Sequence, residues 1–440
     1  MQYSIKKIII DIALALLFPL FFYSAHYYFY FLIWVSFAPL IILAHRTNIY
    51  SFCLYLFPSI IFTSYISVSF VLNFNYEYFI FSFIFISTIF IVTYLFCFLL
   101  YRYNKIKYPL SILVLPVAWM LIVNLFNFVE GANVWFNFAH LQPMSYPVAW
   151  LIGSQGVTFL IMLANSLIAF LILKKDKKII LYLAVIFVIL ISSFAYSNFA
   201  TFNGKKIKVA LIQGNIDRSW DYRIEKSPTE ILDIYKKLSL EAAKNNVNLI
   251  VWPEFAIVAD ITRDQEMYNI VSNIAKETNA YLIFGGLEKT EKTDPKYNYI
   301  KNVTYVFSNN GNFVGKYISV LPSPFNGEVI PGTETPIFKT PFGNFGITVC
   351  AEENYYFLNK RYADSGADFL INITNDNGLK HLGAMRLKSM HSQFSAAENN
   401  KYLLRSANTG FTEVVNPYGK IIAKLEPNTE GFLVADIFIK

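Results

Sequence analysis

Long apolar runs fill the first 200 residues, and each is close to the length that crosses a lipid bilayer. A membrane-spanning helix needs ~20 mostly apolar residues. The runs are Ile8–Tyr23, Tyr27–Leu43, Phe52–Leu72, Phe79–Tyr101, Pro109–Phe128, Trp150–Leu173 and Ile179–Tyr196. This half of the chain is therefore expected to form an all-α membrane bundle of about seven transmembrane helices.

The basic residues between these runs indicate the orientation of the bundle. All of them precede the first run or lie in every second connection: Lys6, Lys7, Arg46, Arg102, Lys105, Lys107, Lys174, Lys175, Lys177 and Lys178. Lys- and Arg-rich loops stay in the cytoplasm, so the N-terminus is expected there and the chain after the last run on the opposite face. No small-residue cleavage pattern follows the first run, which is interpreted as a retained anchor.

The role of the bundle is open between a passive anchor, a substrate-handling domain and a transporter. Asp11 is the acidic residue that falls inside a run, near its cytoplasmic end. A proton or ion pathway normally needs ionisable groups in mid-membrane, so a transporter is disfavoured. Trp135, Phe136 and Phe138, in the connection after the fifth run, are typical of a membrane interface or of the wall of a lipid-entry site.

Residues 201–440 have a different composition and are expected to form a second, catalytic domain after a membrane domain of residues 1–200. They hold 27 Lys/Arg and 26 Asp/Glu, against 10 and 4 before them. The excess positive charge thus lies in the membrane loops, which does not favour nucleic-acid binding. Strand-like segments alternate with the helical patterns Thr229–Lys244, Glu266–Thr278 and Ala384–Asn400. This alternation predicts an α/β or α+β sandwich.

Cys350 is the one cysteine of the second half, so it has no partner for a disulfide within that half. It ends the apolar strand FGITV and precedes a polar turn, a place where α/β folds put reactive groups. An unpaired thiol on the outer face of a membrane is prone to oxidation, which favours a catalytic role over a structural one. Cys53 and Cys97 lie in apolar runs and are interpreted as packing residues.

A thiol attacks as the thiolate and needs a base and a positive charge nearby. Glu254 follows the buried strand LIVW and Pro253, where partial desolvation beside Trp252 would raise its pKa. Lys316 lies early in a strand of a predicted hairpin and would stabilise the thiolate and an oxyanion. A histidine base is less favoured, because His381 and His391 do not follow strands.

The order of Glu254, Lys316 and Cys350 at three strand ends resembles the Glu-Lys-Cys triad of the nitrilase superfamily. VALIQGN, LIVWPE, GKYI and ITVCAEE are the matching pieces, over about residues 206–438. The resemblance implies an α-β-β-α sandwich. Among membrane-fused members, LLRSANTGFTEVVNPYGK, SPFNGEVIP and VWFNFAHLQ resemble apolipoprotein N-acyltransferases, which makes Glu328 and Glu352 expected supporting acids.

The chain departs from that family in four places. Ala351 follows the nucleophile, where an aromatic residue is usual, and the stretch from Lys316 to Glu328 is longer than usual. The usual Asn-Asp-Ala-Trp-Phe stretch reads Asn375-Asp376-Asn377-Gly378-Leu379 here. The family's final span after the catalytic domain has no counterpart before the sequence ends. These departures affect the expected lipid-facing loops more than the triad.

The resemblance implies acyl transfer at a bacterial inner membrane, with the catalytic domain periplasmic. A phospholipid would donate its acyl chain to Cys350, and the N-terminal amine of a diacylglyceryl-cysteine apolipoprotein would accept it. The expected partners are these two substrates and membrane lipids, with a monomeric enzyme, no nucleic acid, no metal and no cofactor. The alternatives are a membrane-tethered amidase that hydrolyses a small amide, and a non-enzymatic scaffold.

Overall fold

The chain forms two compact units, Met1–Phe199 and Ala200–Lys440, in a computed structural model. The structure describes residues 2–69, 72, 76–103, 106–125, 137–217, 227–294, 297–322, 329–377, 379 and 382–439.

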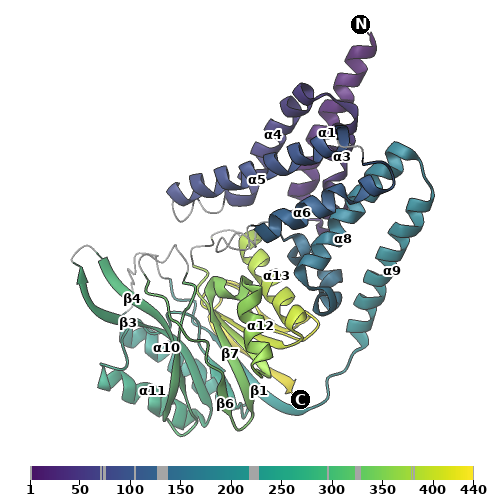
Figure 1. Cartoon of the computed structure of the whole chain (residues 1–440). Coiled ribbons are helices and arrows are strands. Elements are labelled where there is room, and N and C mark those ends of the chain that lie inside the picture. The colour runs from purple at the N-terminus through teal and green to yellow at the C-terminus, as the bar shows by residue number, and fades with distance from the viewer. Residues whose placement is uncertain are drawn as a thin grey trace. The chain divides into compact units, whose positions relative to one another are not determined.

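The described part of the first unit is helical (Figure 1). Among the described residues, five helices are long and apolar enough to cross a membrane, and two shorter apolar helical segments, Tyr30–Arg46 and Leu110–Leu125, match the second and fifth predicted runs. The helices are α1 (Gln2–Tyr27), η1 (Tyr30–Leu32), α2 (Ile33–Ser36), α3 (Ala38–Arg46), α4 (Ile49–Val68), α5 (Tyr76–Arg102), η3 (Leu110–Leu113), α6 (Val114–Leu125), η5 (Phe138–Leu141), η6 (Pro143–Ser145), α8 (Tyr146–Lys174) and α9 (Lys178–Phe199).

The second apolar run is broken between α2 and α3, and Asn165 on α8 explains how the break is tolerated. Its Oδ1 accepts hydrogen bonds from the backbone N–H groups of Phe37, at 2.8 Å, and Ala38, at 3.2 Å. Its Nδ2 donates to the carbonyl of Ile33 at 2.8 Å. Backbone groups released by a helix break inside an apolar bundle need such partners.

Phe138, one of the aromatic residues expected at a membrane interface or at the wall of a lipid-entry site, packs inside the described part of the helical unit. The side chain is 2 % exposed, and its ring lies 5.8 Å from that of Phe22 and 5.3 Å from that of Phe37. Such aromatic contacts place Phe138 in the interior of the bundle. Trp135 and Phe136 lie outside the described residues.

The second unit contains two six-stranded sheets, in the orders β12-β1-β2-β3-β4-β5 and β11-β10-β9-β8-β7-β6. The strands of the first sheet are β1 (Lys205–Gln213), β2 (Leu249–Val251), β3 (Tyr281–Asp294), β4 (Tyr297–Phe307), β5 (Phe313–Ile318) and β12 (Gly431–Ile439). Those of the second are β6 (Phe338–Thr340), β7 (Gly343–Val349), β8 (Phe369–Thr374), β9 (Tyr402–Ala407), β10 (Thr412–Val415) and β11 (Ile421–Leu425).

Helices cover the outer face of each sheet, which gives four layers. One core lies between the sheets and includes Ile207, Val251 and Ile371. A second packs α10 (Pro228–Ala243) and α11 (Gln265–Thr278) on the first sheet, and a third packs α12 (Tyr356–Asp364) and α13 (Leu382–Asn399) on the second. The predicted fold class, an α-β-β-α sandwich joined to an apolar helical part, is confirmed.

The predicted residues Glu254 and Cys350 follow the parallel strands β2 and β7, and reactive groups often gather where such strands end. β1, β2 and β3 run parallel in one sheet, and β7, β8 and β9 run parallel in the other. β2 and β8 are buried along their whole length and β7 over its last five residues, which explains their largely apolar sequences.

Candidate active site

Cys350 lies where β7 ends and the short 3-10 helix η8 (Cys350–Asn354) begins. Its φ of 54° is in the left-handed region, which costs a non-glycine residue ~1–3 kcal/mol and is common at functional sites. Asn372 on β8 donates to the Cys350 carbonyl at 3.1 Å. The neighbouring strand therefore holds the turn that presents the thiol, and the residue is 8 % exposed.

Lys388 on α13 brings a positive charge to the thiol. Its Nζ lies 3.7 Å from Cys350 Sγ, 3.0 Å from Thr374 Oγ1 and 2.6 Å from Asp376 Oδ1. Burial alone would lower the pKa of Lys388, but the charges of Asp376, Cys350 and Glu353 together outweigh burial and raise it. The side chain thus stays an ammonium beside the sulfur at neutral pH.

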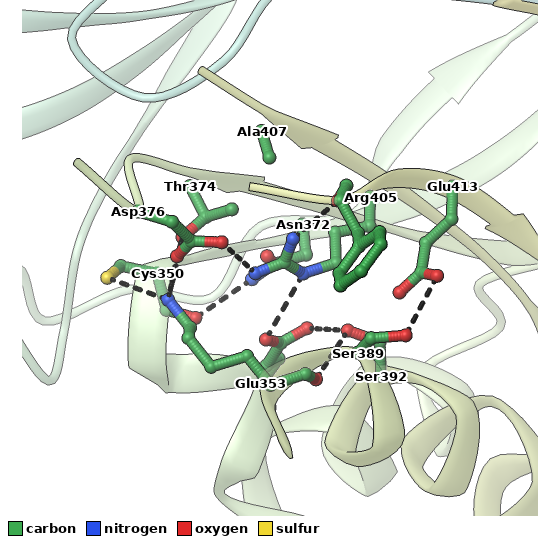
Figure 2. A network of polar contacts seen from close by, with 12 residues as sticks. Cys350, Glu353, Asn372, Thr374, Asp376, Ser389, Ser392, Arg405, Ala407 and Glu413 are labelled. Carbon is green, nitrogen blue, oxygen red and sulfur yellow. Dashed lines mark hydrogen bonds and ion pairs between the residues drawn. The ribbon is translucent and has the colours of Figure 1, made fainter. Parts of the chain in front are cut away.

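Asp376 forms a buried ion pair with Arg405 (Figure 2) and a second ion pair with Lys388. Arg405 Nη2 donates to Asp376 Oδ2 at 2.8 Å, and both side chains are 0 % exposed. Burial would raise the pKa of Asp376, but Arg405 and Lys388 hold it well below its usual range. On its other side Arg405 faces Glu353, whose Oε1 lies 3.6 Å from Arg405 Nε.

Glu254 lies at the tip of β2, as its sequence position predicted, and is buried. Its Oε1 accepts from Asn302 Nδ2 at 2.7 Å, and its Oε2 accepts from the Asn375 backbone N–H at 2.8 Å. Gly285 lets β3 approach this tip, because a Cβ there would lie 2.7 Å from the Glu254 Cα. Burial raises the pKa of Glu254 to about 7, while hydrogen bonds and Lys388 oppose the rise.

The thiol and the acid have the protonation states that proton transfer needs. Burial, together with the Glu254 charge, raises the pKa of Cys350 to about 12, and Lys388 acts in the opposite direction. The resting sulfur is therefore a thiol at neutral pH, whereas Glu254 is ionised in a large fraction of molecules. A base with a pKa near the working pH is well suited to take the thiol proton during attack.

Glu352, a predicted supporting acid, is fully buried and links η8 to the end of β5. Its carboxylate accepts from Tyr317 Oη at 2.9 Å, Ser319 Oγ at 2.8 Å and the Leu321 backbone N–H at 2.9 Å. It also accepts from the Val349 backbone N–H at 2.7 Å. Burial raises the pKa of Glu352, and hydrogen bonds lower it. The contacts make Glu352 a brace for the turn that carries the thiol.

Lys316 is not brought to the thiol, so its predicted place in the site needs correction. It pairs across the strands with Tyr305, whose side chain belongs to the core under α10 and α11. Tyr317, one residue later, belongs to the core between the sheets, as does Cys350. Successive strand residues point to opposite faces, so Lys316 faces away from the thiol. Its ammonium instead pairs with Glu288 at 2.6 Å.

Glu328, the other predicted supporting acid, lies outside the described residues. Of the predicted set, the structure thus brings Glu254, Cys350 and Glu352 into one region and adds Lys388, Asp376 and Arg405.

A family model for carbon-nitrogen hydrolases matches residues 208–439. The chain belongs to the carbon-nitrogen hydrolase family. The predicted membership of the nitrilase group is thereby confirmed, and the match starts in β1 and ends in β12, so it covers both sheets of the carbon-nitrogen hydrolase domain.

Curated relatives of this chain extend the similarity into the helical unit. An apolipoprotein N-acyltransferase of Geobacter metallireducens is 27 % identical over 70 % of this chain and 64 % of its own length. One of Wigglesworthia glossinidia brevipalpis is 26 % identical over 76 % of this chain and 71 % of its own. A solved nitrilase-superfamily amidase of Nesterenkonia is 17 % identical, covers 54 % of this chain and 94 % of its own, and has a TM-score of 0.44.

Sequence reasoning missed Lys388, Asp376 and Arg405 as members of the site. Asp376 carried a usable signal, because it follows the buried strand FLINIT just as Glu254 follows LIVW. Arg405 also carried one, since a charge inside the apolar run YLLRSA must find a buried partner. Lys388 carried none, because a lysine on a helix of mixed composition usually faces solvent.

Proposed function

We propose that this protein transfers an acyl chain from a membrane phospholipid, through a thioester on Cys350, to the N-terminal amine of a diacylglyceryl-cysteine apolipoprotein. The observation that carries the proposal is the thiol at the end of β7, with an ammonium 3.7 Å from Sγ and a buried carboxyl whose pKa is about 7. Long apolar helices on the same chain support a lipid substrate. The names of the curated relatives support the acceptor.

In the first step Glu254 takes the proton of the Cys350 thiol while the sulfur attacks the phospholipid ester carbonyl. The carbonyl oxygen becomes an oxyanion, which nearby N–H donors stabilise. The C–O bond to the lysophospholipid then breaks, and the leaving alkoxide receives the proton from Glu254. A thioester on Cys350 remains, and the burial of the site protects it from water.

In the second step the α-amine of the lipoprotein attacks the thioester carbonyl, and Glu254 takes the amine proton. The C–S bond breaks, an amide forms, and Cys350 recovers its proton from Glu254. Because the first product leaves before the amine reacts, the kinetics should be ping-pong.

A two-stage assay tests this function. The purified protein is first incubated with phospholipid labelled in its acyl chain, and neutral hydroxylamine is used to release thioesters. A diacylglyceryl-cysteine peptide is then added, and the label is expected to move to its amine. Label that appears only as free fatty acid would identify water as the acceptor and favour a hydrolase. Label that persists on the Cys350→Ala protein would exclude Cys350 as the nucleophile.

We also propose a periplasmic catalytic unit, on the argument that all positive loops of the helical unit stay cytoplasmic. Trypsin added to intact spheroplasts should then cleave the second unit, and inverted vesicles should protect it. Protection in spheroplasts with cleavage in inverted vesicles would reverse the orientation.

A further inference from the structure

Two lysines of the second unit form equally short ion pairs, but they lie in different places. Lys316 pairs with Glu288 at 2.6 Å, and Lys388 pairs with Asp376 at 2.6 Å. Of these two ammonium groups, that of Lys388 has the contact with Cys350 Sγ. We propose that Lys388 on α13 is the catalytic ammonium for Cys350, positioned by Asp376 and Arg405; this assignment rests on the acyl-transfer function proposed above.

The three N–H donors of the Lys388 ammonium match three acceptors. Asp376 Oδ1 lies at 2.6 Å, Thr374 Oγ1 at 3.0 Å and Cys350 Sγ at 3.7 Å. An ammonium has three donors and no acceptor, so two strong contacts fix its position and the third donor points to the sulfur. That N–H group can stabilise the negative charge on the sulfur and then, as the sulfur attacks a carbonyl, the charge that develops on the carbonyl oxygen.

Asp376 holds the lysine through one oxygen and Arg405 through the other. Arg405 is itself fixed, since its Nη1 donates to the Phe411 carbonyl at 2.6 Å. The backbone also closes on this carboxylate, because a Cβ at Gly410 would lie 1.9 Å from Asp376 Oδ2. The lysine is therefore attached to a rigid part of β8 and β9, as a precise site requires.

Lys316 is unsuited to the same role. Its side chain is 36 % exposed, against 16 % for Lys388, and its strand turns it to the outer face of the first sheet. Solvent at an exposed ammonium weakens its effect on any nearby charge. Lys316 is thus a matched control for Lys388, because it is also a lysine in a short ion pair but does not contact the thiol of Cys350.

Alkylation of Cys350 by iodoacetamide tests the assignment in the full-length protein, with the Cys350 peptide quantified by mass spectrometry. The rate follows the thiolate fraction, so Lys388→Met and Lys388→Gln should each slow it by about tenfold or more, and Lys316→Met by less than about threefold. The Lys388→Gln variant keeps a hydrogen-bond donor for Asp376 and is therefore less prone to misfold than Lys388→Met. Thermal unfolding of each variant would show whether it is folded. Rates in both Lys388 variants within about threefold of wild type, or equal slowing by Lys316→Met, would overturn the assignment.

The positioning role of Asp376 is tested by a double-mutant cycle with the same readout. Asp376→Asn keeps the shape of the side chain and removes the charge that holds the lysine, so it should slow alkylation, but by less than Lys388→Met, because the lost carboxylate itself raised the pKa of the thiol. The double variant should then be no slower than Lys388→Met alone. Additive slowing would show that Asp376 acts independently of the lysine, as a merely structural residue would.

Alkylation needs no lipid, so the two proposals can fail separately. If the wild-type protein forms no lipid thioester but Lys388→Met slows alkylation, the acyl-transfer function fails and the lysine assignment stands. If the thioester forms in wild type and in folded Lys388→Met at equal rates, the function stands and the lysine assignment fails.

Discussion

The outer face of the first sheet and the end of the second sheet carry the same chemical pair in two settings. Lys316–Glu288 and Lys388–Asp376 both have N···O distances of 2.6 Å. The side chains of the first pair are 36 % and 8 % exposed, and those of the second are 16 % and 0 % exposed. The second pair also has Arg405 behind it and the thiol in front. A lysine and its ion pair are therefore not enough to distinguish the residue beside the thiol. The burial of the side chain and the face of the sheet on which it lies distinguish it.

The largest effect on the acylation rate is expected from a change of Glu254, the proposed base. Glu254→Gln keeps the hydrogen-bonding shape but cannot take a proton, so acylation of Cys350 should slow by about 10²- to 10⁴-fold. Glu288→Gln, the matched amide on the outer face, should leave acylation within about threefold of wild type, since that carboxylate does not face the thiol. Quench-flow measurement of thioester formation gives both rates. Normal acylation in Glu254→Gln would remove it from the base role.

The next effect is on stability. Asp376→Asn leaves buried Arg405 and Lys388 with less compensating charge, which should cost ~3–5 kcal/mol of unfolding free energy. Glu288→Gln breaks a pair whose lysine is partly exposed, so solvent screening limits the loss to ~1 kcal/mol or less. Denaturant unfolding of the detergent-solubilised protein measures both values. Equal losses would mean that burial does not separate the two pairs.

A smaller effect is the pH dependence of acylation. Glu254 works as a base only when ionised, and burial raises its pKa to about 7. The acylation rate should therefore fall about tenfold per pH unit below pH 7 and level off above it. Lys316→Met should show the same midpoint as wild type, because that side chain lies on the other face. A midpoint near the ordinary value for a glutamate would contradict a buried base.

The smallest effect concerns Ser319, beyond the end of β5 on the site side. Ser319→Ala removes one of the donors to buried Glu352, so it should cost ~1 kcal/mol of unfolding free energy. Lys316→Met, by comparison, should cost ~1 kcal/mol or less because its ion pair is partly exposed. Both variants should keep acylation within about threefold of wild type, since neither side chain touches the thiol. A larger loss of unfolding free energy in Lys316→Met than in Ser319→Ala would mean that the exposed ion pair stabilises the fold more than the buried hydrogen bond.

Much of the fold follows from patterns in the sequence. The apolar runs match helices, and Glu254 and Cys350 lie at strand tips. Both features could be predicted, because long apolar segments and strand ends are recognisable from neighbouring residues in the sequence. The role of Asn165 could not be predicted from neighbouring residues in the sequence. The break that it bridges in the second run depends on a contact between residues 128 positions apart in the chain.

The lysine of the site was not predictable for a related reason. The place of Lys316 in a strand favours it, but the face on which it lies depends on strand register, where a shift of one residue reverses the direction of the side chain. Lys388 reaches Cys350 from a helix, across a separation of 38 residues. Only the packing of α13 on the second sheet brings the two together. Asp376 and Arg405, by contrast, are charged residues at or inside apolar strands and could have been selected from the sequence.

Mass spectrometry of the peptide that contains Cys350 shows whether this residue carries the acyl chain. After incubation with a phospholipid of defined acyl chain, we expect a hydroxylamine-sensitive mass increase on that peptide equal to the acyl group. The increase should be absent in Cys350→Ala and should appear much more slowly in Lys388→Met than in Lys316→Met. An acyl adduct on another residue, or none on Cys350 while labelled product still accumulates, would show that Cys350 is not the acyl carrier.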